Sequence, residues 1–122
     1  MAAQDNLSLT QHLQAGQLPM FMTGGEIQKH YQVGDYEHQR DETDADVWNR
    51  KEENAHRYNY DTIGRTIPVS EDKSLAADIL KNGVKKPVKI HEDGRIAEGH
   101  HRTAVMAKRN PKGLVPLEHL EY

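Results

Sequence analysis

The 122-residue chain contains no cysteine, and it has only one tryptophan and one phenylalanine. The absence of cysteine excludes disulfide bonds and metal sites built from thiolates. No apolar run approaches the length of a membrane-spanning helix, and the N-terminus lacks the basic start and apolar core of a signal peptide. We therefore expect a soluble cytoplasmic protein with no membrane partner.

Apolar residues are also few, and the chain carries no excess of positive charge. Hydrophobic residues make up 35% of the chain, charged residues make up 29%, and the formal net charge is -3. These values favour one domain with a modest core and loosely packed segments around it. Because no global positive field draws the protein onto nucleic acid, any contact with DNA must come from a local patch.

Basic residues that could form such a patch gather in the C-terminal half of the chain. They are Lys81, Lys85, Lys86, Lys89, Arg95, Arg102, Lys108, Arg109 and Lys112. A solvated surface is the alternative interpretation, because blocks of charge usually serve solubility. The patch therefore keeps DNA as a candidate partner without requiring it.

A glycine followed by nitrogen-rich side chains stands where a predicted strand meets a predicted helix. A helix N-terminus offers backbone N–H groups and a partial positive charge, and a guanidinium can hold two phosphate oxygens at once. A tight turn with solvated histidines is the alternative on this local pattern. The residues predicted to bind phosphate are Gly99, His100, His101, Arg102 and Thr103.

Glu98 is the one carboxylate that adjoins this turn. As a general base it could remove a proton from water or from a hydroxyl group, which makes it the candidate catalytic residue. The alternative is an ion pair with Lys89 across a β-hairpin, which the two-residue turn signal at Asp93 and Gly94 predicts; opposite charges on neighbouring strands are common. Both roles stay open at this point.

Eight histidines in a chain of this length raise the question of a metal site. The two histidines His100 and His101 are adjacent and point in different directions at a helix start, and no His-Glu-x-x-His or His-x-His spacing occurs. The chain also lacks the cluster of acidic ligands that phosphodiester cleavage by two metal ions requires. The sequence therefore predicts no protein metal site and does not support a nuclease.

From Leu75 to Leu120 the order of signals resembles the ParB/sulfiredoxin-like superfamily. In that family a helix ending in glycine leads through a proline to a strand, a hairpin, a Gly-x-x-Arg turn, a helix and a final strand. The corresponding parts here are residues 75–84, 87–90, 93–94, 99–102, 103–109 and 115–117. The Gly-His-His-Arg form looks most like stand-alone ParB-like proteins of bacteriophages and like ParB-like free serine kinases.

The resemblance implies an α+β fold with short mixed strands and packed helices. It places residues 99–102 at the positions that bind nucleotide phosphates in the ParB CTPases and the kinases. The implied ligand is a nucleoside triphosphate, CTP or ATP, with Mg²⁺, and the implied activities are slow nucleotide hydrolysis or phosphoryl transfer. The implied setting is DNA metabolism, in the host cytoplasm if the protein is encoded by a phage.

Departures from the family pattern limit what the resemblance carries over. Sulfiredoxins place a catalytic cysteine directly after the glycine, where this chain has His100, so sulfinic acid reduction is excluded. The partitioning CTPases carry Gly-Glu-Arg-Arg at this turn, which leaves a preference for CTP open. The second functional hypothesis is a non-catalytic module that keeps the fold and binds a host protein or DNA.

The chain is expected to form a loose N-terminal arm over residues 1–22 and a single domain over residues 23–122. Within that domain we predict a helical N-terminal extension over residues 23–60 and the ParB-like core over residues 66–122. A turn-rich stretch over residues 59–65 separates the extension from the core, and the ParB-like character of the core is what the resemblance over residues 75–120 implies.

Three caps mark the expected helix starts. Thr23 and Glu26 have the spacing of a capping box, which predicts a helix over residues 24–31. Thr43 predicts a helix over residues 44–58, on which Trp48 should anchor the helix to the domain rather than stack on a ligand. Ser70 should begin a helix with this core face: Leu75, Ala76, Ile79 and Leu80.

Overall fold

The computed structural model describes residues 18–34 and 41–122, so most of the expected arm lies outside the described residues. The elements are β1 (Phe21–Thr23), α3 (Gly24–His30), α4 (Asp44–Ala55), β2 (Tyr58–Tyr60), β3 (Thr66–Pro68), η2 (Glu71–Lys73), α5 (Leu75–Asn82), β4 (Val88–Ile90), β5 (Ile96–Glu98), α6 (His100–Arg109) and β6 (Leu114–His119). The α+β fold predicted from the sequence is confirmed.

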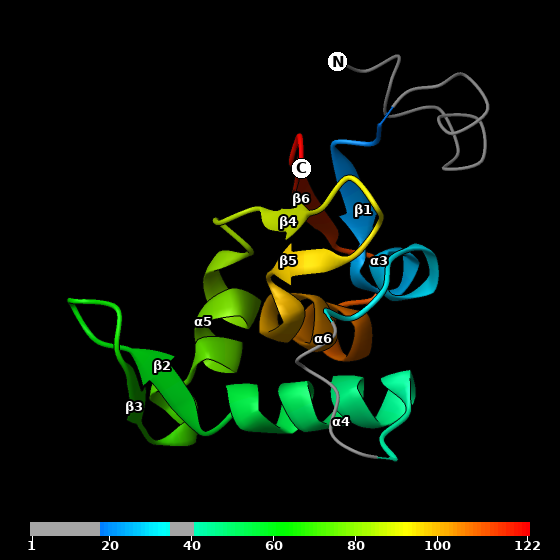
Figure 1. Cartoon of the computed structure of the whole chain (residues 1–122). Coiled ribbons are helices and arrows are strands. Elements are labelled where there is room, and N and C mark those ends of the chain that lie inside the picture. The colour runs from blue at the N-terminus through cyan, green and yellow to red at the C-terminus, as the bar shows by residue number, and fades with distance from the viewer. Residues whose placement is uncertain (1–17, 35–40) are drawn as a thin grey trace.

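Four short strands form one mixed sheet in the order β1-β6-β4-β5 (Figure 1). β6 is antiparallel to β1 and parallel to β4, and β4 is antiparallel to β5. The β4–β5 hairpin closes at Gly94, whose φ of 89° suits the predicted glycine turn. β5 lies at the edge of the sheet and ends at Glu98, two residues before α6 begins.

Helix α6 lies between the sheet and the long helix α4, with α3 and α5 beside it (Figure 1). Residues 103–106, a full turn of α6, are all buried. A helix that is covered on all sides belongs to the core, because a surface helix keeps one face in solvent. The residues predicted to bind phosphate therefore begin the central helix of the molecule.

The two helices of the N-terminal half, α3 and α4, each begin with a capping box at the residue that the sequence predicted. The Thr23 side chain accepts the N–H of Glu26, and the Glu26 carboxylate accepts the N–H of Thr23, at 3.2 and 2.9 Å. Thr43 and Asp46 make the same reciprocal pair at the start of α4. These bonds satisfy N–H groups that a helix leaves without partners, so each start is fixed by local chemistry.

The helix predicted over residues 44–58 is wrong at its C-terminal end. α4 stops at Ala55, and Tyr58 instead begins β2, which pairs antiparallel with β3. Two tyrosines that alternate with Asn59 suit a strand, and pairing with β3 gives their backbone groups hydrogen-bond partners that a frayed helix end would lack. The hairpin spans residues 58–68.

Two expected boundaries fall inside observed elements. The division between an extension ending at residue 60 and a core beginning at residue 66 lies within the β2–β3 hairpin. The division at residue 22 lies within β1, where Phe21 pairs with Pro116 of β6. α3 and α4 also pack on α6, so their buried residues share one core with those of the later segment.

The start and the face of α5 also differ from expectation. Residues 71–73 form the short 3-10 turn η2, so the cap of α5 is Ser74, whose side chain accepts the N–H of Ala77. Ile79 is buried as predicted, whereas Leu80 is 45% exposed. Leu80 falls in the last turn of α5, at the margin of the stripe formed by the buried Leu75, Ala76 and Ile79.

Replacing Trp48 or Ile79 with alanine should lower the free energy of unfolding by about 2 to 5 kcal/mol, because each change leaves a cavity in the core. Leu80→Ala, on the exposed side of α5, is the matched control and should change it by less than about 0.5 kcal/mol. Urea denaturation followed by circular dichroism measures all three variants. A loss as small as the control's in Trp48→Ala would contradict its role as an anchor.

Candidate functional site

Gly99 joins β5 to α6 in a conformation that favours glycine. Its φ is 105° and its ψ is 18°, in the left-handed region. A Cβ atom at this position would lie 2.8 Å from Cγ2 of Val88 and 3.1 Å from Nη2 of Arg102. The backbone angles and the packing against β4 therefore both require a residue without a side chain here.

The N-terminus of α6 is built differently from those of the other described α-helices. α3, α4 and α5 begin with side-chain caps, whereas α6 has no side-chain cap and no acidic residue in its first turn. The first N–H groups of a helix have no partner within the helix and carry the positive end of its dipole. With His101 and Arg102 in place of acidic residues, this helix start is suited to an anion.

His100, the first residue of α6, points into the core. Its side chain is 5% exposed, its ring packs against Trp48 with centroids 5.8 Å apart, and its Nε2 lies 3.3 Å from the N–H of Gly34. A backbone N–H can only donate, so Nε2 acts as the acceptor and carries no proton in this bond. The imidazole therefore ties α6 to α4 and to residue 34, and the predicted phosphate contact of His100 is left to its backbone.

A row of aromatic rings runs from the first turn of α6 along β2. The ring of His101 meets Tyr58 edge to face, with centroids 5.2 Å apart, and Tyr58 meets Tyr60 in the same way at 5.6 Å. Both geometries are among those preferred by aromatic pairs. Tyr60 ends the row and is 47% exposed, so it presents a ring to solvent beside the predicted site.

Arg102 is partly buried beside the same strand. Its Nη2 donates to the backbone carbonyl of Pro87 at 3.0 Å, and its Nε has no hydrogen-bond partner among the described residues. Burial lowers the pKa of Arg102, and the nearby Tyr60, Glu98 and Tyr58 oppose that shift. One end of the guanidinium is thus fixed by protein, and the group is only partly shielded from a ligand.

Glu98 and Thr103 differ in their access to a ligand. Oε2 of Glu98 is 3.6 Å from Nζ of Lys89, so the ion pair considered as its alternative role is present, and both side chains are exposed. Thr103 is fully buried, and its hydroxyl has no partner in the described part of the chain. Glu98 can meet a ligand at the rim, whereas the hydroxyl of Thr103 is enclosed in the core.

The structure brings together Gly99, His101 and Arg102, and it adds residues that the sequence did not place here. Tyr58 and Tyr60 were missed because the segment was assigned to a helix and a turn. The alternation of aromatic residues before a turn over residues 61–65 was the signal available. Lys85 and Lys86, both exposed, come directly before Pro87 and add positive charge to the same loop.

Three further features of the described residues bear on function: groups of metal ligands, membrane-spanning helices and pockets away from the start of α6. No group of three or more histidine, aspartate or glutamate side chains among the described residues is arranged to hold a metal ion. In the same residues no helix is long and apolar enough to cross a membrane. A hollow over the middle of α4 shares none of the predicted site residues; it is lined by Gln28, Trp48, Asn49, Glu52, Ala104, Ala107 and Lys108.

Comparison of the chain with protein-family models, with curated proteins and with solved structures finds no match. A functional proposal must therefore be argued from the described residues themselves. At the predicted site the available features are the uncapped start of α6, the Arg102 guanidinium and the exposed Tyr60 ring.

Gly99→Ala should lower the free energy of unfolding by about 1 to 3 kcal/mol more than Gly94→Ala does, since only the new methyl group at residue 99 meets neighbouring atoms. Gly94 is the matched control because its φ is also positive and nothing lies within 4 Å of a Cβ there. Thermal and urea unfolding measure the difference. Equal losses would mean that backbone angles alone require Gly99.

Proposed function

We propose that this protein is a ParB-like domain that binds a nucleotide, with the phosphates at the N-terminus of α6. The observation that carries the proposal is the first turn of α6, which has no cap and no acidic residue and contains Arg102. The order of elements from α5 to β6, with Gly83, Pro87, Gly94 and Gly99 between them, supports the superfamily resemblance.

Phosphate would contact the protein through two kinds of donor. Backbone N–H groups of the first turn of α6 supply fixed donors, and the guanidinium of Arg102 supplies charge. Lys85 and Lys86 lie next to Pro87, which holds that guanidinium, so they add charge from the neighbouring loop. Because Gly99 has no side chain, the N-cap residue of α6 does not block the approach of a phosphate group to the helix N-terminus.

The nucleobase would stack on Tyr60. Its exposed ring stands at the end of the row that begins at His101, and aromatic rings stack on any base because every base has a π face. This arrangement accommodates CTP and ATP equally. Base discrimination is therefore not a property of the stacking contact.

Catalysis, if the domain hydrolyses the nucleotide or transfers its phosphoryl group, would depend on Glu98 as general base. Its exposed ion pair with Lys89 is weak enough to be exchanged for a ligand contact. Mg²⁺ would be held mainly by the phosphates, because a nucleotide usually supplies most of the oxygen ligands in such sites. A role in phage DNA metabolism rests on the same resemblance.

One observation favours a second candidate function, a module that binds a host protein. The β2–β3 hairpin projects from the body of the domain, and it exposes Ile63, Ile67 and Tyr60 (Figure 1). Exposed large apolar side chains on one projecting element are a common feature of protein interfaces. This function would use the hairpin without requiring a nucleotide.

Arg102→Lys should weaken binding of ATP or CTP with Mg²⁺ by a factor of about 10 to 100, because lysine keeps the charge but loses the planar fork. Arg95→Lys is the matched control, since Arg95 pairs with Asp93 at the far end of the hairpin. Titration calorimetry on the folded variants measures the affinities. Unchanged affinity in Arg102→Lys, or no binding of either nucleotide by the parent, would contradict the proposal.

Tyr60→Ala should weaken nucleotide binding by a factor of about 5 to 100, the range expected from the loss of one base-stacking contact. Its affinity for inorganic triphosphate should stay unchanged, because that ligand has no base. Tyr60→Phe keeps the ring and should bind like the parent. An equal loss for nucleotide and triphosphate in Tyr60→Ala would mean that Tyr60 acts on the phosphates instead.

A further inference from the structure

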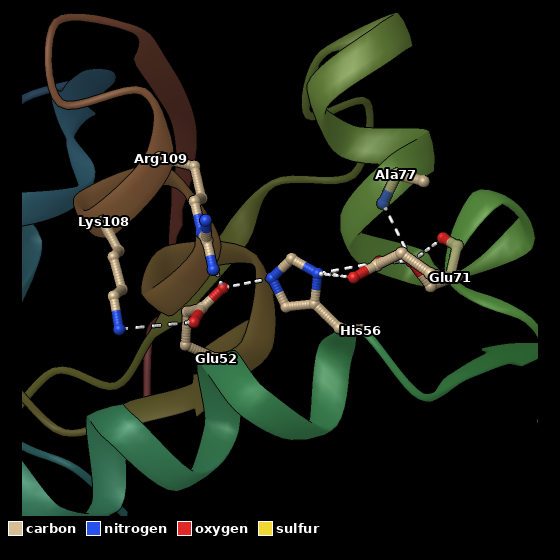
Figure 2. Close-up of polar contacts among 7 residues, drawn as sticks. Glu52, His56, Glu71, Ala77, Lys108 and Arg109 are labelled. Carbon is tan, nitrogen blue, oxygen red and sulfur yellow. Dashed lines mark hydrogen bonds and ion pairs between the residues drawn. The ribbon is translucent and has the colours of Figure 1, made fainter.

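Glu52 is a carboxylate in the interior of the protein, remote in sequence from the predicted site. It lies on α4, is 3% exposed and is surrounded by cationic side chains (Figure 2). Nε of Arg109 lies 3.3 Å from Oε2 and Nζ of Lys108 lies 3.7 Å from Oε1, while Nε2 of His56 bonds to Oε2. A buried charge needs such partners, because its loss of hydration is otherwise costly.

His56 stands between two carboxylates that come from different elements. Its Nδ1 lies 2.8 Å from Oε2 of Glu71 in η2, on the side opposite Glu52, as Figure 2 shows. Carboxylates only accept hydrogen bonds, so each ring nitrogen must carry a proton to donate. Only the doubly protonated, positively charged ring can therefore link α4 to η2 through both bonds.

The electrostatic surroundings favour that charged form. Burial alone would lower the pKa of His56, but hydrogen bonds to Glu71 and Glu52 and the charges of both carboxylates raise it above its ordinary value. Burial alone would raise the pKa of Glu52, but His56 and Arg109 hold it below its usual range. The cations Lys108 and Arg109 of α6 face His56 from behind Glu52.

The link reaches the start of α5 through Glu71. The Ser74 hydroxyl donates to the Glu71 carbonyl at 2.7 Å, lies 3.1 Å from the Glu71 carboxylate and accepts the N–H of Ala77, which caps α5. Asn59 of β2 donates to the carbonyl of Lys73 at 3.0 Å. η2 is therefore tied to α4, α5 and the β2–β3 hairpin at once.

Two residues that contact the proposed phosphate site, Tyr58 and Pro87, belong to segments that this link joins. Tyr58, which contacts His101, follows His56 by two residues at the end of α4. Pro87, which holds Arg102, follows α5 through a short loop. A change in the position of η2 and α5 relative to α4 would thus move both sides of the site.

We propose that the His56 ring, bridging Glu52 and Glu71, is a pH-operated lock that holds the β2–β3 hairpin and the start of α5 against α4 and α6, and so regulates phosphate binding at α6. The lock itself stands on the contacts of His56. The regulatory part rests on the function proposed above, and it follows because a locked hairpin and loop would preorganise the site.

The direction of the pH dependence follows from the two pKa shifts. The contribution of His56 to stability is fully present below its unfolded pKa of about 6.5 and is lost as pH rises through its raised folded pKa. The contribution of Glu52 is present above its unfolded pKa of about 4.3 and is lost as pH falls through its lowered folded pKa. The lock is complete between these limits and opens on the alkaline side.

Titration of the His56 ring signals by NMR tests the lock without any ligand. Glu71→Gln should lower the pKa of His56 by about 1, because it removes one of two adjacent negative charges. Glu71 is a suitable position because its side chain is 67% exposed, so the variant should fold. Glu53→Gln is the matched control: it removes the same charge from the exposed residue next to Glu52 and should leave the pKa close to that of the parent.

Hydrogen exchange supplies the conformational measurement. In the parent, the protection factors of the Ala77 and Asp78 amides should fall as pH rises through the pKa of His56, because both amides bond to Ser74. In Glu71→Gln these factors should be low at every pH. An unchanged pKa of His56 in Glu71→Gln, or protection that does not follow the titration of His56, would overturn the lock.

Titration calorimetry with inorganic triphosphate at pH 6, and at a pH well above the His56 pKa that NMR measures in the parent, tests the regulatory part. The parent should bind about fivefold more tightly than Glu71→Gln at pH 6, a typical strength for coupled sites, and nearly equally at the higher pH. Protonation of the ligand affects both proteins alike and cancels in this ratio. Equal affinities of the two proteins at pH 6 would overturn the regulatory part. Absence of binding by the parent would overturn both the regulatory part and the proposed function. In either case the NMR titration of His56 decides whether the lock exists.

Discussion

The complete burial of the second turn of α6 is the constraint on which the rest of the structure depends. The sheet, α3, α4 and α5 all pack against this helix. α3 approaches so closely that a Cβ on Gly24 would lie 2.5 Å from the backbone nitrogen of Ala107 and 2.8 Å from the carbonyl of Thr103. A residue with a side chain at position 24 would therefore force α3 away from α6.

The same burial divides the first turn of α6 into an inner and an outer side. The His100 side chain accepts a hydrogen bond from Gly34 and packs against Trp48, so it contributes to the packing of α6 against α4. His101 and Arg102 stay near the surface beside β2 and the Pro87 loop. A helix start held in this way changes little when a ligand arrives, which is the condition for strong binding of an anion by backbone N–H groups.

The parts of the fold that could be predicted from the sequence are those set by near neighbours in the chain. The capping box of Thr23 and Glu26 and the hairpin turn at Gly94 involve residues at most three apart, and both were predicted correctly. The strand at Tyr58 depends on pairing with Pro68, which local helix signals do not reveal. The His100 side chain points into the core because it bonds to Gly34, which is 66 residues away in the sequence. The sequence therefore identified the residues of the helix start but could not predict the direction of each side chain.

The buried Glu52 was missed for a related reason. The i,i+4 spacing of Glu52 and His56 was visible on the predicted helix, but Lys108 and Arg109 come from the other end of the chain. Patterns of spacing identify which charges are neighbours along one helix. They do not identify which of those charges the tertiary packing removes from water.

Glu52 and Glu98 show how burial separates structural charge from charge that remains able to react. Glu98 pairs with Lys89 in solvent, where an ion pair is worth less than about 1 kcal/mol, so a ligand can replace that partner. Glu52 has lost its water and keeps three cationic neighbours, so breaking one contact leaves a buried charge partly uncompensated. The proposed chemistry with a ligand therefore fits the exposed rim near Gly99, whereas in the proposed lock the geometry of that rim is controlled from the interior, through the His56 ring between Glu52 and Glu71.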